Sequence, residues 1–143
     1  MARWVGPTIA KGALVLAASL LAGCGGTKGK ATAENAVVEF HHKLDGGDFA
    51  SIYAAAHPDF KTASSEKDFV AILEAVHRKL GNTVAVDQVG WRVNSLNLKT
   101  NVALNYKTKF TGGDAVESFN YRVESGNALL LGYNINSQAL ILK

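Results

Sequence analysis

The spacing of the apolar residues changes at Gly81, and no other feature of the sequence restricts the fold as much. Before Gly81 the apolar residues recur every three or four positions, which is the period of one face of a helix. After Gly81 they alternate with polar residues, which is the period of one face of a strand. Helices followed by consecutive strands are typical of an α+β domain with an antiparallel sheet. The length of 143 residues suits one such domain.

Three helices are predicted before Gly81. The first covers residues 32–44, where the apolar positions share one face. The second follows Asp48, a residue type that caps helix N-termini, and ends before Pro58. The third follows the sequence SEKD at 65–68, which resembles a capping box in its Asp variant. It ends at Gly81, where a C-terminal glycine cap belongs.

Four strands are predicted after Gly81. Leu96 and Leu98 continue the first strand after Val93 on the opposite parity, which predicts a β-bulge near Asn94-Ser95. The sequences at 111–114 (TGGD) and 125–127 (SGN) predict hairpin turns. The apolar residues that alternate along the four strands are Val89, Trp91 and Val93; Val102, Leu104, Tyr106 and Phe110; Phe119, Tyr121 and Val123; and Leu129, Leu131, Tyr133 and Ile135.

Residues 1–23 have the pattern of a secretory signal peptide. Their only charged residues are Arg3 and Lys11, and residues 12–21 form an uncharged, mostly apolar run. This run is shorter than the roughly 17–25 residues that a helix needs to cross a bilayer. We therefore expect a cleaved signal and not a membrane-spanning helix.

The end of this signal carries the only cysteine of the chain. Leu21-Ala22-Gly23-Cys24 resembles the lipobox of bacterial lipoprotein precursors. The resemblance implies that cleavage leaves Cys24 as the new N-terminus, with a thioether-linked diacylglyceryl group and usually an amide-linked acyl chain. Two or more acyl chains anchor a protein stably in a membrane. The alternatives are an ordinary signal peptide with a chance cysteine, or a buried structural thiol.

The residues after the cysteine predict how and where the protein is attached. Residues 24–31 are rich in glycine and are expected to form a lipid-anchored flexible tether, with a single domain over residues 32–143. In lipoproteins of bacteria with two membranes, an Asp after the cysteine resembles a signal for inner-membrane retention. Gly25 stands there instead, which favours the outer membrane, with the domain facing the periplasm.

The charge of the chain gives no support to a nucleic-acid partner. Removal of the signal peptide takes away two of the 15 basic residues and none of the 12 acidic ones. The mature chain is therefore nearly neutral, whereas a dedicated nucleic-acid binder carries a basic surface.

The order of the elements resembles the α+β cone of the nuclear transport factor 2-like superfamily. The phrases GGDFASIYAAAHPDFK, KDFVAILEAVHRKLG and YKTKFTGGDAVESFNYRVESGNALLLGYNI are similar to bacterial lipoproteins with a small cone-type domain of unknown function. The resemblance covers roughly residues 32–137 and implies three N-terminal helices packed on a curved four-stranded antiparallel sheet. Members of the superfamily use the cone for enzymes, for ligand pockets and for dimerisation, so the fold does not define the function.

The sequence predicts neither a metal site nor a cofactor. Adjacent His41 and His42 would project about 100° apart on a helix and would not converge on one ion. His57 precedes a proline in a turn, where it could bond to local backbone, and His77 borders the apolar face of its helix. We expect ordinary surface or boundary histidines.

Two classes of function remain. The first is a non-catalytic, lipid-anchored envelope protein that binds another envelope protein, a small apolar ligand or a second copy of itself. The second is a cone-fold enzyme of the isomerase or hydratase kind. Enzymes of this fold place a carboxylate and tyrosines inside the cavity for proton transfer, and Asp87, Tyr106 and Tyr121 would fill these roles here. The other interpretation of the tyrosines is sheet packing with the hydroxyls at the rim.

Two further apolar features have two interpretations each. Trp91 is predicted to pack in the core or on the sheet, or else to form the wall of a ligand pocket. Leu140, Ile141 and Leu142 either pack back on the domain or form an exposed contact edge.

Overall fold

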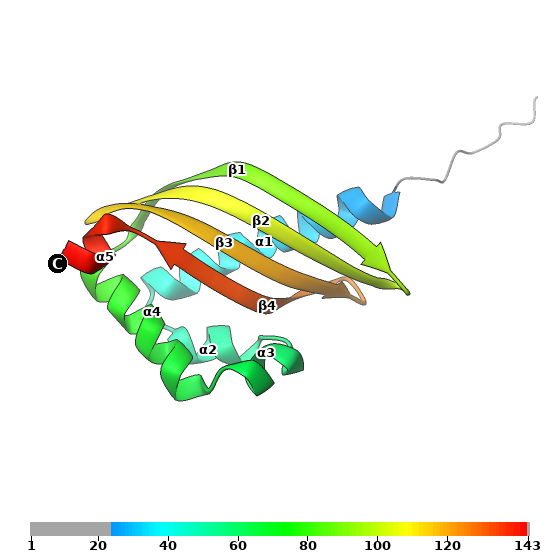
Figure 1. Cartoon of the computed structure of the whole chain (residues 1–143), viewed down its shortest axis with the longest axis horizontal. Helices are drawn as coiled ribbons and strands as arrows, with labels where there is room; N and C mark the ends of the chain where they lie inside the picture. Colours follow the sequence, from blue (N-terminus) through cyan, green and yellow to red (C-terminus); the bar gives the residue numbers. More distant parts are fainter. Residues whose placement is uncertain (1–23, 143) are drawn as a thin grey trace, which may run out of the picture.

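The computed structural model describes residues 24–142, which form an α+β domain with a four-stranded antiparallel sheet (Figure 1). The sheet order is the order of the strands in the chain, and three hairpins join the strands. The elements are α1 (Cys24–Asp45), α2 (Phe49–Ala54), α3 (Pro58–Ala63), α4 (Glu66–Leu80), β1 (Thr83–Leu96), β2 (Lys99–Phe110), β3 (Gly113–Glu124), β4 (Asn127–Asn136) and α5 (Gln138–Leu142).

The first helix is longer than the sequence predicts. α1 begins at Cys24, so it includes residues 24–31, the segment expected to form a flexible tether. Gly29 is buried against β2, and a Cβ atom at this position would lie 3.3 Å from Thr100 Cγ2. Lys30 pairs with Glu34 one turn later. These contacts offset the poor helix propensity of the glycines.

Four helices precede the sheet within the described residues, whereas the sequence predicts three. The additional helix is α3, which begins at Pro58, in the segment expected to form only a turn. His57 caps this helix, because its Nδ1 accepts a hydrogen bond from the Asp59 N–H at 3.1 Å. Phe60 then packs on Phe69 of α4, with the ring centroids 4.9 Å apart.

The predicted ends of α4 are confirmed. The Ser65 hydroxyl caps the helix, because it accepts a hydrogen bond from the Asp68 N–H. It also donates one to the Asp68 carboxylate, whereas in a full capping box this carboxylate would accept from the Ser65 backbone N–H. At the other end Gly81 has φ +74°, a value that favours glycine.

The hairpin turns are confirmed, but the bulge of β1 lies elsewhere than predicted. Asn94 and Ser95 pair regularly with β2, and the register shifts instead at Val84 and Val89. Leu98, expected to continue the strand, is a turn residue with φ +63°. The parity change in the sequence therefore marks a turn and not a bulge.

β4 contains a second irregularity that the sequence does not reveal. The register shifts between the pairs Asn120–Gly132 and Tyr121–Leu130, which leaves Leu131 as the extra residue. One extra residue moves the side chains beyond it to the opposite face of the sheet. Leu130 is therefore buried, whereas Leu129 and Leu131 are only partly buried.

The core lies between the helices and one face of the sheet (Figure 1). α1 contacts all four strands, and α4 packs on α1, α2 and α5. Phe40 of α1 meets Phe119 of β3 edge to face, with the ring centroids 5.0 Å apart. No helix within residues 24–142 is long and apolar enough to span a membrane. Leu21, Ala22 and Gly23 of the predicted cleavage sequence lie outside the described residues.

Candidate functional site

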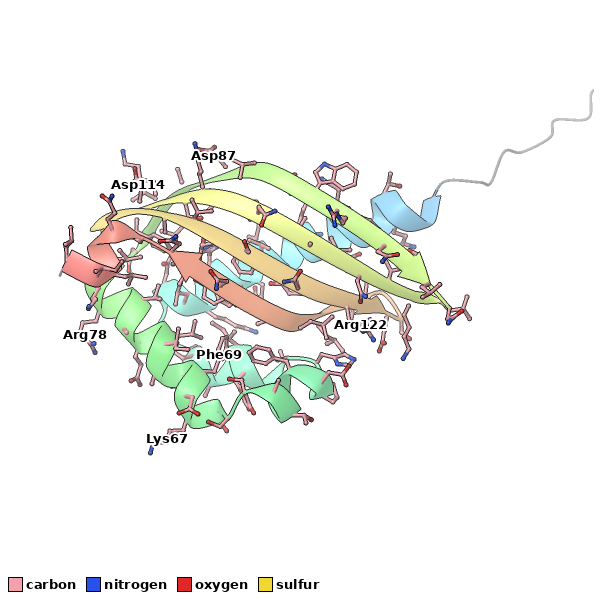
Figure 2. The ribbon with its side chains drawn as sticks, in the orientation of Figure 1. Lys67, Phe69, Arg78, Asp87, Asp114 and Arg122 are labelled. Carbon is pink, nitrogen blue, oxygen red and sulfur yellow. The ribbon has the colours of Figure 1, made fainter. Side chains whose placement is uncertain are left out.

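The three residues proposed for proton transfer do not share a cavity. Tyr106 and Tyr121 face the helices and are 6% and 3% exposed. Asp87 pairs with Lys107 on the opposite face of the sheet and is exposed. Figure 2 shows Asp87, together with Asp114, on the side of the sheet away from α4.

A different carboxylate, that of Glu117, occupies the core. Glu117 lies on β3 between the buried residues Ala115 and Phe119 and is fully buried itself. The Thr108 hydroxyl donates a hydrogen bond to Glu117 Oε2 at 2.5 Å, and the Tyr133 hydroxyl donates one to Oε1 at 2.6 Å. His41 Nε2 of α1 lies 2.8 Å from Oε2. We refer to these four residues as the Glu117 cluster.

The hydrogen bonds of His41 define where its protons lie. Nδ1 lies 3.0 Å from the Val37 carbonyl oxygen, which can only accept, so Nδ1 carries a hydrogen. The two hydroxyl donors at Glu117 suit an ionised carboxylate. Nε2 and Glu117 Oε2 share a hydrogen bond inside the core, which is an ion pair when His41 is protonated.

The tyrosines inside the domain are held in their neutral form. Burial raises the pKa of Tyr133 well above its usual value, and the charge of Glu117 and the hydrogen bond to it raise that pKa further. Burial likewise raises the pKa of Tyr121. Both phenols can donate hydrogen bonds near neutral pH, but neither is suited to accept a proton as a general base.

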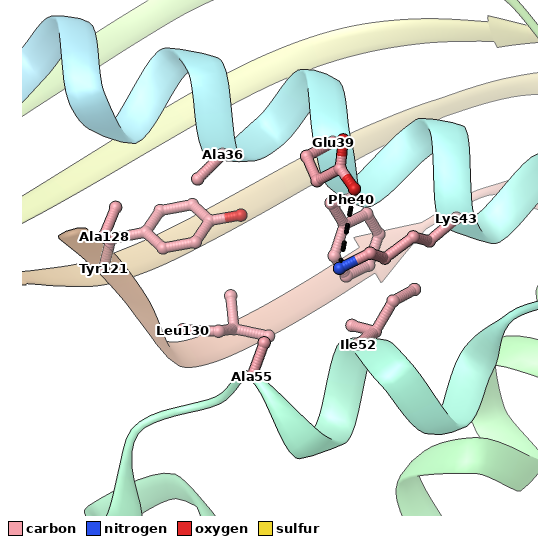
Figure 3. Close-up of a pocket in the computed structure, with 9 residues that line it drawn as sticks. All are labelled: Ala36, Glu39, Phe40, Lys43, Ile52, Ala55, Tyr121, Ala128 and Leu130. Atoms are coloured by element: carbon pink, nitrogen blue, oxygen red, sulfur yellow. Dashed lines mark ion pairs between the residues drawn. The ribbon is translucent and has the colours of Figure 1, made fainter.

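A small cavity lies beside the cluster, between α1, α2 and the strands β3 and β4 (Figure 3). The Tyr121 ring forms one wall, and Glu39 and Lys43 form an ion pair of 3.5 Å on the solvent side. Its volume of about 90 Å³ is well below the roughly 300–1,000 Å³ of typical ligand pockets. The cavity has room for a few water molecules at about 30 Å³ each.

A larger depression of about 930 Å³ lies near α5 at the end of the sheet. Asp87 belongs to its lining, together with Lys107, Lys109 and Asp114, so its charged groups have both signs. Apolar side chains of Val116 and Leu142 complete part of the lining. Thr108 of the Glu117 cluster also belongs to the lining, and the depression is open to solvent.

The four histidines occupy different environments. His41 is buried, contrary to the expected surface or boundary position, because Glu117 supplies its partner. His57 caps α3, which confirms the expected bond to local backbone. His42 is exposed, and His77 is partly buried against Phe49. No group of three or more histidine, cysteine or acidic residues within residues 24–142 could hold a metal ion.

Trp91 is not a core residue. It is 59% exposed at the edge of the sheet, and Lys30 Nζ lies 5.3 Å from its ring centroid. Both interpretations of the C-terminal segment apply to part of it. Leu140 packs on the core, whereas Ile141 and Leu142 are 79% and 81% exposed.

Sequence reasoning missed Glu117, although the sequence contains a signal for it. Along β3 the positions Ala115, Phe119 and Tyr121 alternate toward the core, and Glu117 has the same parity. An acidic residue at a core position requires a partner. The partners come from α1, β2 and β4, so only the tertiary structure identifies them.

The chain was also compared with known proteins. No protein-family model matches it, and no curated protein matches it either.

Proposed function

We propose that this protein is a lipoprotein of the cell envelope, attached to a membrane through acylated Cys24. The observation that carries the proposal is the position of the only cysteine of the chain. Cys24 directly follows the predicted signal peptide and is also the first residue of α1. Cleavage before Cys24 would therefore leave every described element intact. In a bacterium with two membranes, Gly25 favours the outer membrane, with the domain in the periplasm.

We propose further that the domain is an α+β cone of the nuclear transport factor 2-like kind. Two features support this proposal: α1 contacts all four strands, and the strands bend along its length (Figure 1).

The domain is proposed to bind a partner without catalysis. The Glu117 cluster supports this proposal, because its hydrogen-bonding groups already bond to one another or to backbone. The cavity beside it is too small for a typical ligand. One observation favours the enzyme alternative: the buried carboxylate of Glu117 lies beside the Tyr133 hydroxyl. However, Glu117, His41 and Tyr133 line neither of the two cavities described above. Thr108, the fourth residue of the cluster, lines the depression near α5.

An exposed apolar strip between α1 and β1 is the surface proposed for a protein partner. Glu34 and Asp45 of α1 both accept hydrogen bonds from β1, so this side of the helix faces the edge strand. Val38 lies between them and is 69% exposed. Val86 of β1, on the helix-facing side of the sheet, is 37% exposed. Exposed apolar surface of this kind marks interaction sites.

The anchor is tested by producing the chain with its own signal and measuring the mass of its N-terminal peptide. We expect a peptide that begins at residue 24 and carries acyl chains, and a protein that partitions into the detergent phase. The Cys24→Ser variant should lose the acyl mass and stay uncleaved. Equal mass and partitioning of the two proteins would refute the anchor.

The partner surface is tested by crosslinking in envelope fractions, followed by capture of the protein. We expect Val38→Glu to remove the crosslinked partner. Ile72→Glu is the matched control, because Ile72 is also an exposed apolar residue (50%) but lies on α4. Loss of the partner in both variants, or in neither, would contradict the assignment of the surface.

A further inference from the structure

The hairpin between β1 and β2 ends in an unusual turn. Leu96 pairs with Lys99, so only Asn97 and Leu98 form the loop. Their φ values of +51° and +63° are those of a type I′ turn. Leu98 is fully exposed and Leu96 is 70% exposed. We refer to residues 96–99 as the hairpin tip.

Leu98 gives no benefit to the fold at this position. A type I′ turn prefers glycine at its second loop residue, because a side chain is strained at positive φ. The hairpin between β3 and β4 has glycine there, with Gly126 at φ +78°. The exposed Leu98 side chain contributes nothing to the core that would offset this strain. Its apolar surface is therefore available to something outside the molecule.

The hairpin tip lies at the same end of the molecule as the start of α1 (Figure 1). Gly29 of α1 is in contact range of Thr100, the residue directly after the tip. Cys24 precedes Gly29 by little more than one helical turn, about 7.5 Å at 1.5 Å per residue. A membrane that holds Cys24 would thus lie close to the tip.

This end of the molecule carries several basic residues. Arg92 and Lys99 lie on the strands that form the tip, and the neighbouring hairpin between β3 and β4 carries Arg122 and Glu124, which form an ion pair of 3.5 Å. α1 contributes Lys28, which is exposed, and contains no acidic residue before Glu34. Glu34 is already paired with Lys30. The charge complements the anionic headgroups of a bilayer.

We infer that the hairpin tip is a second membrane contact, in which Leu96 and Leu98 enter the bilayer interface and Lys99 meets anionic headgroups. The inference rests on the proposed lipid anchor and deepens it. Interfacial binding grows with the apolar area buried and with attraction to anionic lipid. An acylated cysteine alone leaves the domain free to rotate, whereas a second contact fixes its orientation. α5, at the opposite end, then points away from the membrane (Figure 1).

The test uses the full-length protein, processed in the cell and placed in vesicles of phosphatidylcholine and phosphatidylglycerol that contain a lipid-bound quencher. A fluorophore is attached at Leu98→Cys or, as the control, at Ile141→Cys on α5. Ile141 is also exposed (79%) but lies at the other end of the domain. The thioether at Cys24 blocks its thiol, so each variant carries one reactive thiol. We expect quenching at position 98 to exceed that at position 141 at least about threefold, and to weaken without phosphatidylglycerol.

A second comparison separates membrane contact from folding. The fluorophore is attached at Leu96→Cys, with and without Leu98→Gly. This glycine suits the turn, so the melting temperature should stay equal or rise. Quenching at position 96 should nevertheless fall at least about twofold, because half of the apolar tip is gone. Unchanged quenching would refute the inference.

The two proposals can fail separately. Acyl mass on the N-terminal peptide with equal quenching at positions 98 and 141 overturns the tip contact and leaves the anchor standing. Absence of acyl mass overturns the anchor. Stronger quenching at position 98 than at position 141 in the Cys24→Ser background, where the label has a single thiol, then supports the tip as a membrane contact in its own right. Absence of both overturns both.

Discussion

The interaction between His41 and Glu117 can be measured directly, because each residue can be replaced separately and both can be replaced together. Glu117→Leu removes the acceptor of three groups: the imidazole of His41 and the hydroxyls of Thr108 and Tyr133. Each buried donor left unpaired costs about 1–3 kcal/mol. Removing one partner of a buried ion pair costs about 3–5 kcal/mol in total. We expect Glu117→Leu to lower the free energy of unfolding by about that amount.

The double variant is the informative one. His41→Phe alone leaves the buried Glu117 side chain without its imidazole partner, and we expect a cost of similar size. In His41→Phe/Glu117→Leu no charge is left in the core, and Phe40, Phe110 and Phe119 already surround the His41 ring. The double variant should therefore be less destabilised than the sum of the single variants by about 2 kcal/mol or more.

The assay is urea unfolding followed by far-ultraviolet circular dichroism, on the chain from residue 24 onward with Cys24→Ser. The dependence of the unfolding free energy on urea must stay equal among the variants for the comparison to hold. The matched control is the ion pair of Lys43 and Glu39 on the same helix, at 3.5 Å, in which the glutamate side chain is 61% exposed. Alanine substitutions there should show a coupling of only about 0.3–0.5 kcal/mol.

The result could refute the reasoning in a clear way. Additive effects within about 0.5 kcal/mol, as for distant sites, would show that His41 and Glu117 do not depend on each other. A cost below about 1 kcal/mol for Glu117→Leu would show that the Glu117 cluster does not hold a buried charge.

Three further predictions concern pH, a strained glycine and a helix cap. Because the pKa of Tyr133 is raised in the folded state, that state keeps the phenolic proton which the unfolded chain loses above about pH 10. The free energy of unfolding should therefore fall above pH 10, by up to about 1.4 kcal/mol per pH unit for this group. Urea unfolding between pH 9 and 11 checks this, and Tyr133→Phe should flatten the slope. Gly81→Ala should cost at least about 2 kcal/mol more than Gly47→Ala in urea unfolding, and equal costs would contradict this. Both glycines have φ +74°, but Gly81 also has ψ −150°, a conformation that is essentially restricted to glycine, and there the added Cβ would lie 2.1 Å from Thr111 Oγ1. Ser65→Ala should lower the melting temperature, because the lost N-cap is worth about 1 kcal/mol. An unchanged melting temperature would mean that the cap contributes nothing.

The sequence by itself determined the elements that depend on neighbouring residues. The change of period at Gly81, the helix N-cap at Ser65 and the hairpin turn at Ser125-Gly126 all act within a few residues, so they could be predicted. The α+β class follows from them, because each amphipathic element must cover its apolar face with another.

The tertiary structure decided where single side chains point and what they meet. The alternation of Val89, Trp91 and Val93 would place Asp87 on the same face, but the bulge at Val89 turns Asp87 to the opposite face. One extra residue has this effect because the side chains of a strand alternate with a period of two. The position of the bulge depends on how β1 pairs with β2, and no pattern of neighbouring residues predicts this pairing.

The start of α1 and the Glu117 cluster were also decided by contacts between distant segments. Residues 24–31 become helical where Gly29 packs against Thr100, although their composition favours a flexible linker. His41 and Glu117 meet across 76 positions of sequence. The sequence marks Glu117 as a charge at a core position, but its partner is known only when α1 lies on the sheet. The lipid anchor at Cys24, in contrast, is predicted from the sequence alone, because the prediction depends on four consecutive residues, 21–24, and on no tertiary contact.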